Sequence, residues 1–126
     1  WAQDPQLAPR PRSQEAERLV TIRKRADFLA ANRGRRIAMP GFVLQVRPRG
    51  DDAATKRFGV TVTKKIGNAV VRNRMKRRFR ALARDLLPTG GLPGADHVLI
   101  GRAGGVERDF SKLREELVAA LAKATT

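Results

Sequence analysis

Residues 42–47 and 58–63 alternate between apolar and more polar positions with the two-residue period of a β-strand. One set of side chains is apolar enough to bury a core face: Phe42, Leu44, Val46, Phe58, Val60 and Val62. The other set is expected to form a more polar, open face: Val43, Gln45, Arg47, Gly59, Thr61 and Thr63. Because only the loop of residues 48–55 separates the two stretches, they are predicted to pair as an antiparallel hairpin.

Three other stretches carry apolar residues at helical spacing, and one more is typical of a strand. The helices are predicted over residues 19–32, 69–87 and 110–123, and the strand over residues 96–102. The order α-β-β-α-β-α predicts an α+β fold, an α/β sandwich with a central, mostly antiparallel sheet. Residues 19–124 are expected to form this single domain. Residues 1–18 contain three prolines and no sustained periodicity, so they are expected to be a flexible tail.

The second predicted helix carries an unusual charge. Nine Lys and Arg residues lie between Lys64 and Arg84 with no acid among them. Asn68 is a good N-cap, and Pro88 is expected to end the helix. An apolar stripe that can dock on the sheet runs along one side: Val71, Met75, Phe79, Leu82 and Leu86. The exposed remainder is then almost entirely cationic.

Cations at the start of this helix face the positive end of the helix dipole, which disfavours them by roughly 0.3–1 kcal/mol per charge. A bound anion would offset this cost, because free backbone N–H groups and nearby arginines favour phosphate. The plainer interpretation is a solvated basic face, which is what most runs of charge are.

The whole chain is strongly basic, with a formal net charge of +15 in 126 residues and a pI of about 11.7. Such a field points to a polyanion, either nucleic acid or an anionic membrane. No apolar run is long enough to span a bilayer, and the basic helix has no Trp to anchor it on one, so no membrane partner is expected. We expect a cytoplasmic protein.

Several kinds of chemistry lack the residues they require. The chain has no Cys and a single His, so disulfides, zinc sites and His-based nucleophilic catalysis are not expected. The acids are scattered, which disfavours a protein-only nuclease with two metal ions. We therefore expect no catalytic residue and no metal ligand on this chain. Aromatic residues make up only 5% of it, too few for a row of stacking rings.

The stretch KKIGNAVVRNRMKR, residues 64–77, resembles the signature of the bacterial ribonuclease P protein subunit, with Arg72-Asn73-Arg74 as its core. RADFLAANRG is similar to the first helix of that family, FVLQV and RFGVTVTKK to its strands, and DHVLIGR to the strand after the basic helix. The resemblance covers about residues 22–122. It implies a small α/β sandwich with a left-handed βαβ crossover, where the general rule would give a right-handed one.

The resemblance also implies the function of an accessory protein of an RNA enzyme. The subunit binds a large catalytic RNA and precursor tRNA, and the complex removes the 5′ leader of the precursor by endonucleolytic cleavage. Magnesium is held mainly by RNA and substrate, and no cofactor is expected on the protein. The expected partners are the catalytic RNA and precursor tRNA, with no obligate protein partner.

Two RNA-binding surfaces follow from the resemblance. The first, for the catalytic RNA, comprises Lys64, Lys65, Gly67, Asn68, Arg72, Asn73, Arg74, Lys76, Arg77 and Arg80. The second, for the single-stranded leader, comprises Phe28, Val43, Gln45, Thr61, Thr63 and Lys65. A lone ring among small polar side chains suits a strand that is bound mostly through its backbone.

The sequence departs from the family pattern at two positions. Asn32 and Gln45 stand where family members often carry aromatic residues. Stacking on the leader is therefore expected to be weaker here, and polar contacts to contribute more. Arg33, Arg35 and Arg36 could substitute electrostatically.

Other interpretations stay open at this point. Phe28 could be an ordinary core contact, and Thr61 and Thr63 could be strand residues without a ligand. His97 is expected to be a packed or edge histidine, and the acids Asp51 and Asp52 to lie in a solvated turn. A ribosomal-type structural RNA-binding protein is the alternative function, since it fits the composition and fold class equally well but not the 64–77 signature.

Overall fold

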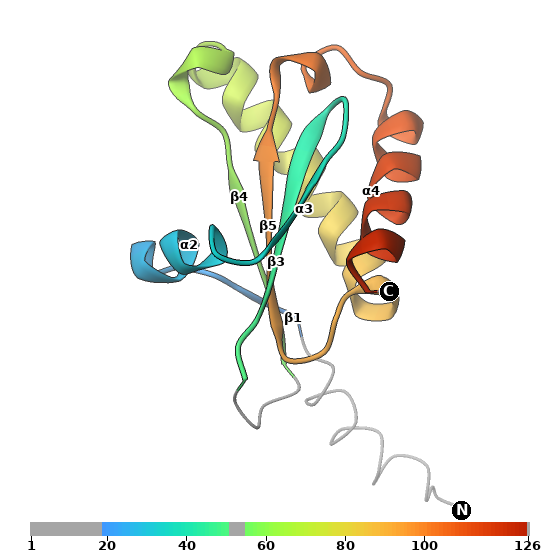
Figure 1. Cartoon of the computed structure of the whole chain (residues 1–126). Coiled ribbons are helices and arrows are strands. Elements are labelled where there is room, and N and C mark those ends of the chain that lie inside the picture. Colours follow the sequence, from blue (N-terminus) through green and yellow to red (C-terminus); the bar gives the residue numbers. More distant parts are fainter. Residues whose placement is uncertain (1–18, 51–54, 126) are drawn as a thin grey trace, which may run out of the picture.

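Figure 1 shows the computed structural model, which describes residues 19–50 and 55–125. The predicted tail, residues 1–18, and the loop acids Asp51 and Asp52 lie outside the described residues. The elements are, in chain order, β1 (Leu19–Thr21), α2 (Arg25–Ala31), β2 (Arg35–Ala38), β3 (Phe42–Pro48), β4 (Lys56–Thr61), the 3₁₀ turn η2 (Lys64–Ile66), α3 (Ala69–Gly90), β5 (Ala95–Gly101), the 3₁₀ turn η3 (Ala103–Gly105) and α4 (Phe110–Ala124).

The described strands form one mixed sheet in the order β1-β4-β5-β3-β2. β3 runs antiparallel to both of its neighbours, whereas β1, β4 and β5 run parallel to one another. The predicted α+β sandwich is confirmed. The predicted hairpin of β3 and β4 is wrong, because β5 lies between them. Alternation identifies a strand and its two faces, but it does not select the neighbouring strand.

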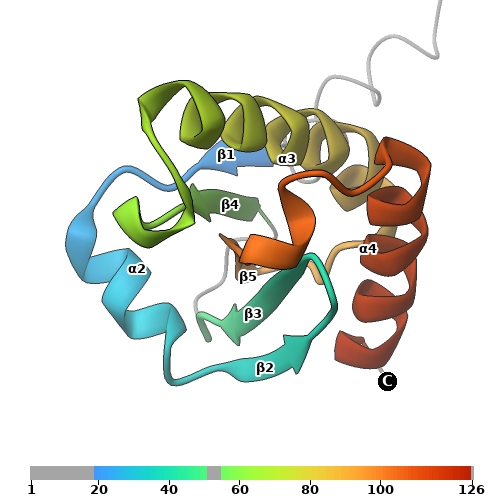
Figure 2. The same ribbon diagram turned by 90° about the horizontal axis from the view of Figure 1, so that it is seen from above.

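The connection from β4 through α3 to β5 is a βαβ unit of two adjacent parallel strands. In Figure 1 these strands run upward, β5 lies to the right of β4, and α3 passes behind the sheet. This crossover is left-handed, as the family resemblance implied and against the general rule. Figure 2 shows α2 on one face of the sheet and α3 and α4 against the other.

The N-terminal part of the domain differs from the expectation. The predicted helix 19–32 is split, because β1 pairs in parallel with β4 and Ile22 N–H donates to the Phe58 carbonyl at 2.7 Å. Helix α2 begins only at Arg25. The edge strand β2 was not predicted at all. It has four residues of sequence RRIA and buries only Ile37, so its sequence gives little sign of a strand.

The core lies between the sheet and the two long helices. The predicted apolar stripe of α3 is confirmed for Met75, Phe79, Leu82 and Leu86, which are buried, whereas Val71 is only half-buried. Ala83 and Leu87 join the buried side. Phe79 meets the ring of Phe42 edge to face, with centroids 5.7 Å apart. α4 adds buried side chains of its own: Leu113, Leu117, Ala120, Leu121 and Ala124.

α3 continues to Gly90, past the proline predicted to end it. Pro88 has no N–H and so cannot donate a helical hydrogen bond. The buried ammonium group of Lys56 stabilises this end of the helix by donating to the carbonyls of Leu87 at 3.1 Å and Pro88 at 2.6 Å. A cation at the negative end of the helix dipole is favourable.

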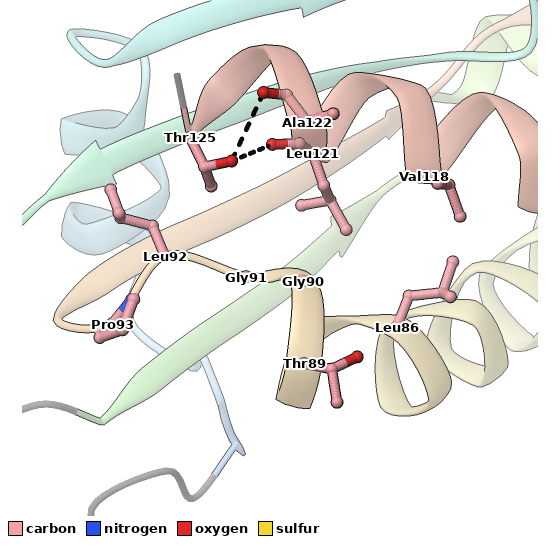
Figure 3. Close-up of a pocket in the computed structure, with 10 residues that line it drawn as sticks. All are labelled: Leu86, Thr89, Gly90, Gly91, Leu92, Pro93, Val118, Leu121, Ala122 and Thr125. Carbon is pink, nitrogen blue, oxygen red and sulfur yellow. Dashed lines mark hydrogen bonds between the residues drawn. The ribbon is translucent and has the colours of Figure 1, made fainter.

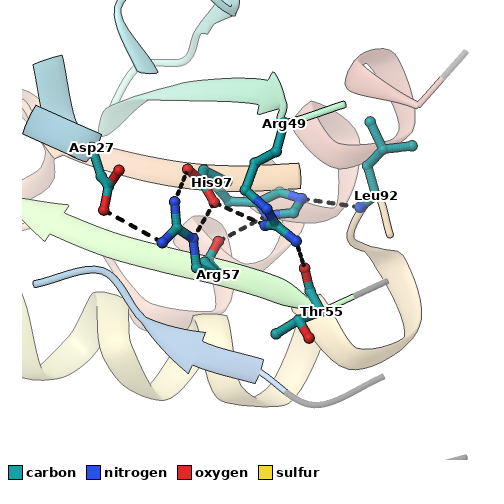
Figure 4. Close-up of polar contacts among 7 residues, drawn as sticks. Asp27, Arg49, Thr55, Arg57, Leu92 and His97 are labelled. Carbon is teal, nitrogen blue, oxygen red and sulfur yellow. Dashed lines mark hydrogen bonds and ion pairs between the residues drawn. The ribbon is translucent and has the colours of Figure 1, made fainter. Parts of the chain in front are cut away.

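His97 is packed in the sheet, at 1% exposure (Figure 4). Its Nε2 accepts a hydrogen bond from Leu92 N–H at 3.0 Å, and its Nδ1 lies 3.1 Å from the Arg57 carbonyl. A neutral ring with the proton on Nδ1 satisfies both contacts. Burial lowers the pKa of His97 to about 4, and its backbone hydrogen bond opposes this only in part. His97 is thus a neutral structural residue.

We predict that the protein loses stability as the pH falls below about 6.5. Above that pH the imidazole is neutral in both the folded and the unfolded chain. Below it, the unfolded chain takes up a proton that the folded chain cannot take up until about pH 4. The lowered pKa should therefore cost about 2 kcal/mol of unfolding free energy by pH 5. Urea unfolding at a series of pH values measures this change.

His97→Gln is the matched control, because this chain has no other histidine. The variant should show a flat pH dependence between pH 7 and pH 5, whatever its absolute stability. An equal pH dependence in both proteins would show that His97 is not the group responsible.

Candidate nucleic-acid interface

The N-terminal end of α3 is a compact turn built by Gly67 and Asn68. The predicted N-cap is confirmed, since Asn68 Oδ1 accepts from Val71 N–H at 3.0 Å. Arg72 Nε donates back to the Gly67 carbonyl at 3.2 Å. A side-chain carbon at Gly67 would lie 3.0 Å from two carbons of Val71, so the turn leaves little space there. The cap therefore fixes Arg72 against the start of the helix.

We call the exposed side of this region the basic helix surface: Lys64, Lys65, Gly67, Asn68, Arg72, Asn73, Arg74, Arg77 and Arg80. All of these are exposed except Gly67 and Arg72, which are half-buried. Within the described part of the chain, none of the nine Lys and Arg residues from Lys64 to Arg84 forms a salt bridge. Positive charge is thus gathered on one side of a well-packed helix without compensation.

Two cations of α3 point away from this surface. The guanidinium of Arg78 donates to the Arg108 carbonyl and lies over the ring of Phe110, 5.8 Å from its centre. Lys76 was predicted to bind the catalytic RNA, but the structure places it in a groove on the other flank of the helix, together with Phe28.

This α2 groove lies between α2, the end of β4 and α3, and has a volume of about 460 Å³. Its lining combines three cations, a ring and small side chains: Arg23, Arg25, Phe28, Leu29, Val60, Thr61, Val62 and Lys76. Two of the residues predicted to bind the leader, Phe28 and Thr61, therefore lie together. Thr63 and Lys65 are exposed just beyond the end of β4.

The predicted open face is closed at Val43 and Gln45, which are only 4% and 3% exposed. They lie on the α2 side of the sheet as predicted, but Gln45 Nε2 is occupied by a hydrogen bond to Asn32 Oδ1 at 2.9 Å. The two polar residues that depart from the family pattern are thus partners of each other. Alternation could not reveal that α2 covers this part of the sheet.

Phe28 rests on the sheet over a residue without a side chain. A Cβ atom at Gly59 would lie 2.4 Å from Phe28 Cε1 and 2.6 Å from Cζ. The ring can therefore lie this close to β4 only because this position is glycine. Phe28 is half-buried and packs against the small cluster of Ile22, Ala31 and Val98. It is both a packing residue and a wall of the α2 groove.

A buried ion-pair cluster attaches the other side of α2 to the sheet (Figure 4). Arg57 donates two hydrogen bonds of 2.6 Å to the carboxylate of Asp96, and Arg49 donates a third at 3.0 Å. Arg57 also reaches Asp27 of α2 at 3.4 Å. Burial alone would raise the pKa of Asp96, but the hydrogen bonds from the two arginines outweigh burial and lower it. Asp96 therefore stays ionised and paired.

Sequence reasoning missed Arg23, Arg25 and Leu29 as groove residues. Arg25 precedes Phe28 and Leu29 by three and four positions, and residues at that spacing lie on one face of a helix. That spacing was the available signal. No sequence pattern indicated the position of Arg23, which depends on the turn between β1 and α2.

Another hollow, between the C-terminal ends of α3 and α4, has no charged side chain in its lining (Figure 3). Leu86, Leu92, Val118 and Leu121 make it largely apolar. It offers a polyanion nothing to bind. Among the described residues, no three His, Asp or Glu side chains gather in a way that could hold a metal ion. None of the described helices is long and apolar enough to cross a membrane.

Comparison with known proteins agrees with this fold. The family model described as Ribonuclease P matches residues 16–125. The "Ribonuclease P protein component" of Erythrobacter litoralis is 67% identical over 105 residues, 83% of this chain and 85% of the relative. The RNase P protein of Thermotoga maritima has a similar structure, with a TM-score of 0.68 and 32% identity over 82% of this chain and 96% of that one. The RNase P protein of Staphylococcus aureus has a similar structure, with a TM-score of 0.71 and 28% identity over 84% of this chain and 97% of that one.

Gly59→Ala should destabilise the protein by about 1–3 kcal/mol, because the new methyl group and the ring of Phe28 cannot occupy the same space. In a Phe28→Ala background the same change should cost much less, since the ring is gone. Chemical unfolding of the two single variants and the double variant gives this coupling energy. Additive effects would mean that Phe28 does not rest on Gly59.

Proposed function

Because the chain belongs to the ribonuclease P protein family, we propose that it binds the catalytic RNA through the basic helix surface and the 5′ leader of precursor tRNA in the α2 groove. As the protein component of a ribonucleoprotein endoribonuclease, it associates with the ribonuclease P RNA. In this proposal it assists the cleavage that removes the leader and gives the mature 5′ end. The expected location is the cytoplasm, where such a substrate would be processed.

The observation that carries the first half of the proposal is the uncompensated charge of η2 and α3. Nine cations stand in sequence without an acid, and in the described part of the chain none of them forms a salt bridge. Phosphates would relieve the repulsion among them and would also meet the free N–H groups at the helix start. The guanidinium group of an arginine can donate two parallel hydrogen bonds to the oxygens of one phosphate. The exposed amide of Asn73 can both donate and accept hydrogen bonds at the edge of a base.

The α2 groove supports the second half. It offers one ring for stacking and three cations for phosphates, which suits a single strand bound largely without sequence preference. Its position beside α3 would allow one RNA complex to engage both surfaces, with Lys76 between them. Gln45 and Val43 are not part of the proposed contact, because both side chains are buried.

The proposal leaves the chemical step to RNA. Magnesium, held by RNA and substrate, would supply the Lewis acid and the activated water. What the protein contributes is binding and orientation of the substrate. A ribosomal-type structural role would share the basic surface, but the family found by comparison gives it no support.

Arg72→Ala with Arg74→Ala should weaken binding to the ribonuclease P RNA while leaving thermal unfolding nearly unchanged. Each lost phosphate contact should flatten the slope of log affinity against log salt by roughly 0.7–0.9. When the holoenzyme is reconstituted at low magnesium, a higher concentration of the variant than of the unmodified protein should be needed for cleavage of precursor tRNA at the correct site. Arg78→Ala is the matched control, because Arg78 faces α4. If the double variant binds the RNA with unchanged affinity and unchanged salt dependence, the cations of the basic helix are only solvated and do not contact the RNA.

Phe28→Ala should weaken binding of precursor tRNA by the holoenzyme in a manner that depends on leader length. A base stacked on a ring contributes roughly 1–3 kcal/mol, and we expect the lower end because the ring is half-buried. Precursors with a leader of one or two nucleotides should be unaffected, since they do not reach the groove, and affinity for the catalytic RNA should not change. Equal weakening for short and long leaders would contradict the assignment of the leader to this groove.

A further inference from the structure

The apolar hollow between the C-terminal ends of α3 and α4, called here the C-terminal hollow, has no part in the proposed function. Its volume of about 460 Å³ lies within the range of ligand pockets, roughly 300–1,000 Å³. Leu86 of α3 and Val118 of α4 face each other across it, and Leu92 and Pro93 border it (Figure 3). No residue of its lining is charged, although the chain has a net charge of +15. The hollow therefore fits an apolar, uncharged occupant.

Val118 is the exposed apolar residue that the rest of the structure leaves without a neighbour of its own kind. Among the described residues, four large apolar side chains are exposed: Leu29, Val70, Phe110 and Val118. Leu29 lines the α2 groove, Val70 lies among the cations of the basic helix surface, and Phe110 lies beneath the guanidinium of Arg78. Val118 is 51% exposed and lines the C-terminal hollow. An apolar occupant would remove it from water, which is favourable.

The last turn of α3 would also gain from an occupant. It contains Pro88 and Gly90, the two residue types of lowest helix propensity. Lys56 holds the carbonyl groups of Leu87 and Pro88 from the sheet. Thr89 and Gly90 of the same turn line the hollow, and Thr89 is exposed. A segment seated in the hollow would therefore cover the part of the helix that is least stable by itself.

The described part of the chain begins close to this end of α3. Leu19 pairs with Lys56 in the register of β1 and β4, and the Lys56 ammonium contacts the carbonyls of Leu87 and Pro88. One strand spacing, about 4.8 Å, and one lysine side chain therefore separate Leu19 from the end of α3. Six extended residues span about 20 Å. Residues 1–18 precede Leu19, so their first half is within reach of the hollow.

The composition of residues 1–9, WAQDPQLAP, suits such a site. Asp4 is their single charge, whereas residues 10–18 carry five. Trp1 and Leu7 supply large apolar side chains. Two prolines restrict the unbound segment and so reduce the entropy that it loses on binding. Because it has no Lys or Arg, this segment is not suited to bind RNA phosphates.

We propose that residues 1–9 fold back onto the C-terminal hollow of the same chain, with Trp1 and Leu7 packed against Leu86 and Val118. The connection through residues 10–18 makes the contact intramolecular, with an effective concentration in the millimolar range, so a modest apolar contact suffices. The first half of the expected flexible tail is then held on the domain. This inference is independent of the proposed function, because the hollow shares no lining residue with the α2 groove or the basic helix surface.

Intrinsic fluorescence of the full chain tests the proposal, because Trp1 is its single Trp and it has no Tyr. In the folded protein, emission should lie at shorter wavelength than in urea, and acrylamide should quench it several-fold less. Val118→Arg should shift the emission to that of the unfolded chain, while circular dichroism still shows cooperative unfolding. Val118→Ile should keep the folded signal. Leu29→Arg is the matched control, since Leu29 is 53% exposed outside the hollow, and it should leave the emission unchanged.

Urea unfolding gives a second measurement. Deletion of residues 1–9 should lower the unfolding midpoint of the unmodified protein but not that of Val118→Arg, because both changes remove the same contact. Equal lowering in both would overturn the proposal. If Val118→Arg does not fold, Ala122→Arg places the same charge at another exposed position of the lining.

Three fluorescence results would also overturn the inference. Emission of the folded, unmodified protein that equals that of the unfolded chain would show that Trp1 is not buried. Emission that responds to Leu29→Arg and not to Val118→Arg would place Trp1 in the α2 groove. A short-wavelength emission that is lost on dilution, together with dimers in sedimentation, would make a second copy of the chain the partner.

Discussion

The burial of one side of α3 against the sheet is the interaction on which the rest of the structure depends. Met75, Phe79, Leu82 and Leu87 anchor the helix, and each fully buried side chain of this size contributes on the order of 1.5–3 kcal/mol. Repulsion among neighbouring cations on the outer side costs only tenths of a kcal/mol per pair. Packing therefore exceeds repulsion, and the domain can present a dense positive surface on a rigid element. A helix of this charge without such an anchor would not be expected to stay folded before it meets RNA.

The opposite layer is attached differently, by few apolar contacts and several polar ones. α2 has seven residues, too few for a stable helix in water by itself. Its position is set at one end by Asp27 and the Arg57–Asp96 pair, at the other by Asn32 and Gln45, and between them by Phe28 on Gly59. Each of these contacts has a definite geometry, so together they fix the position of α2, which forms one wall of the groove. The surface proposed to take a flexible strand is thus positioned by hydrogen-bond geometry.

Much of this could be predicted from the sequence, and the errors have physical reasons. The helix at residues 69–87, its cap at Asn68 and its apolar stripe follow from local rules, since capping and periodicity act within a few residues. The order of the strands does not: nothing local indicates that β5 separates β3 from β4. The burial of Gln45 depends on α2, a contact between residues thirteen positions apart. The groove was partly predicted through Phe28 and Thr61. That Lys76 also lines it was not predicted, because the sequence of a helix does not show which other element lies beside each of its flanks.

The place of β5 in the sheet has a consequence for synthesis of the protein. β3 and β4 are made early, yet each has its long partner in β5, which begins only at Ala95. Until β5 leaves the ribosome, both strands have an unpaired edge and an uncovered apolar face, the state in which nascent chains are most prone to associate wrongly. The sheet cannot close progressively from the N-terminus; it closes in one late step, when β5 inserts between two strands already made. Folding of this domain should therefore wait until β5 has been made, and a chain truncated before Ala95 should remain unfolded although it contains the whole basic helix.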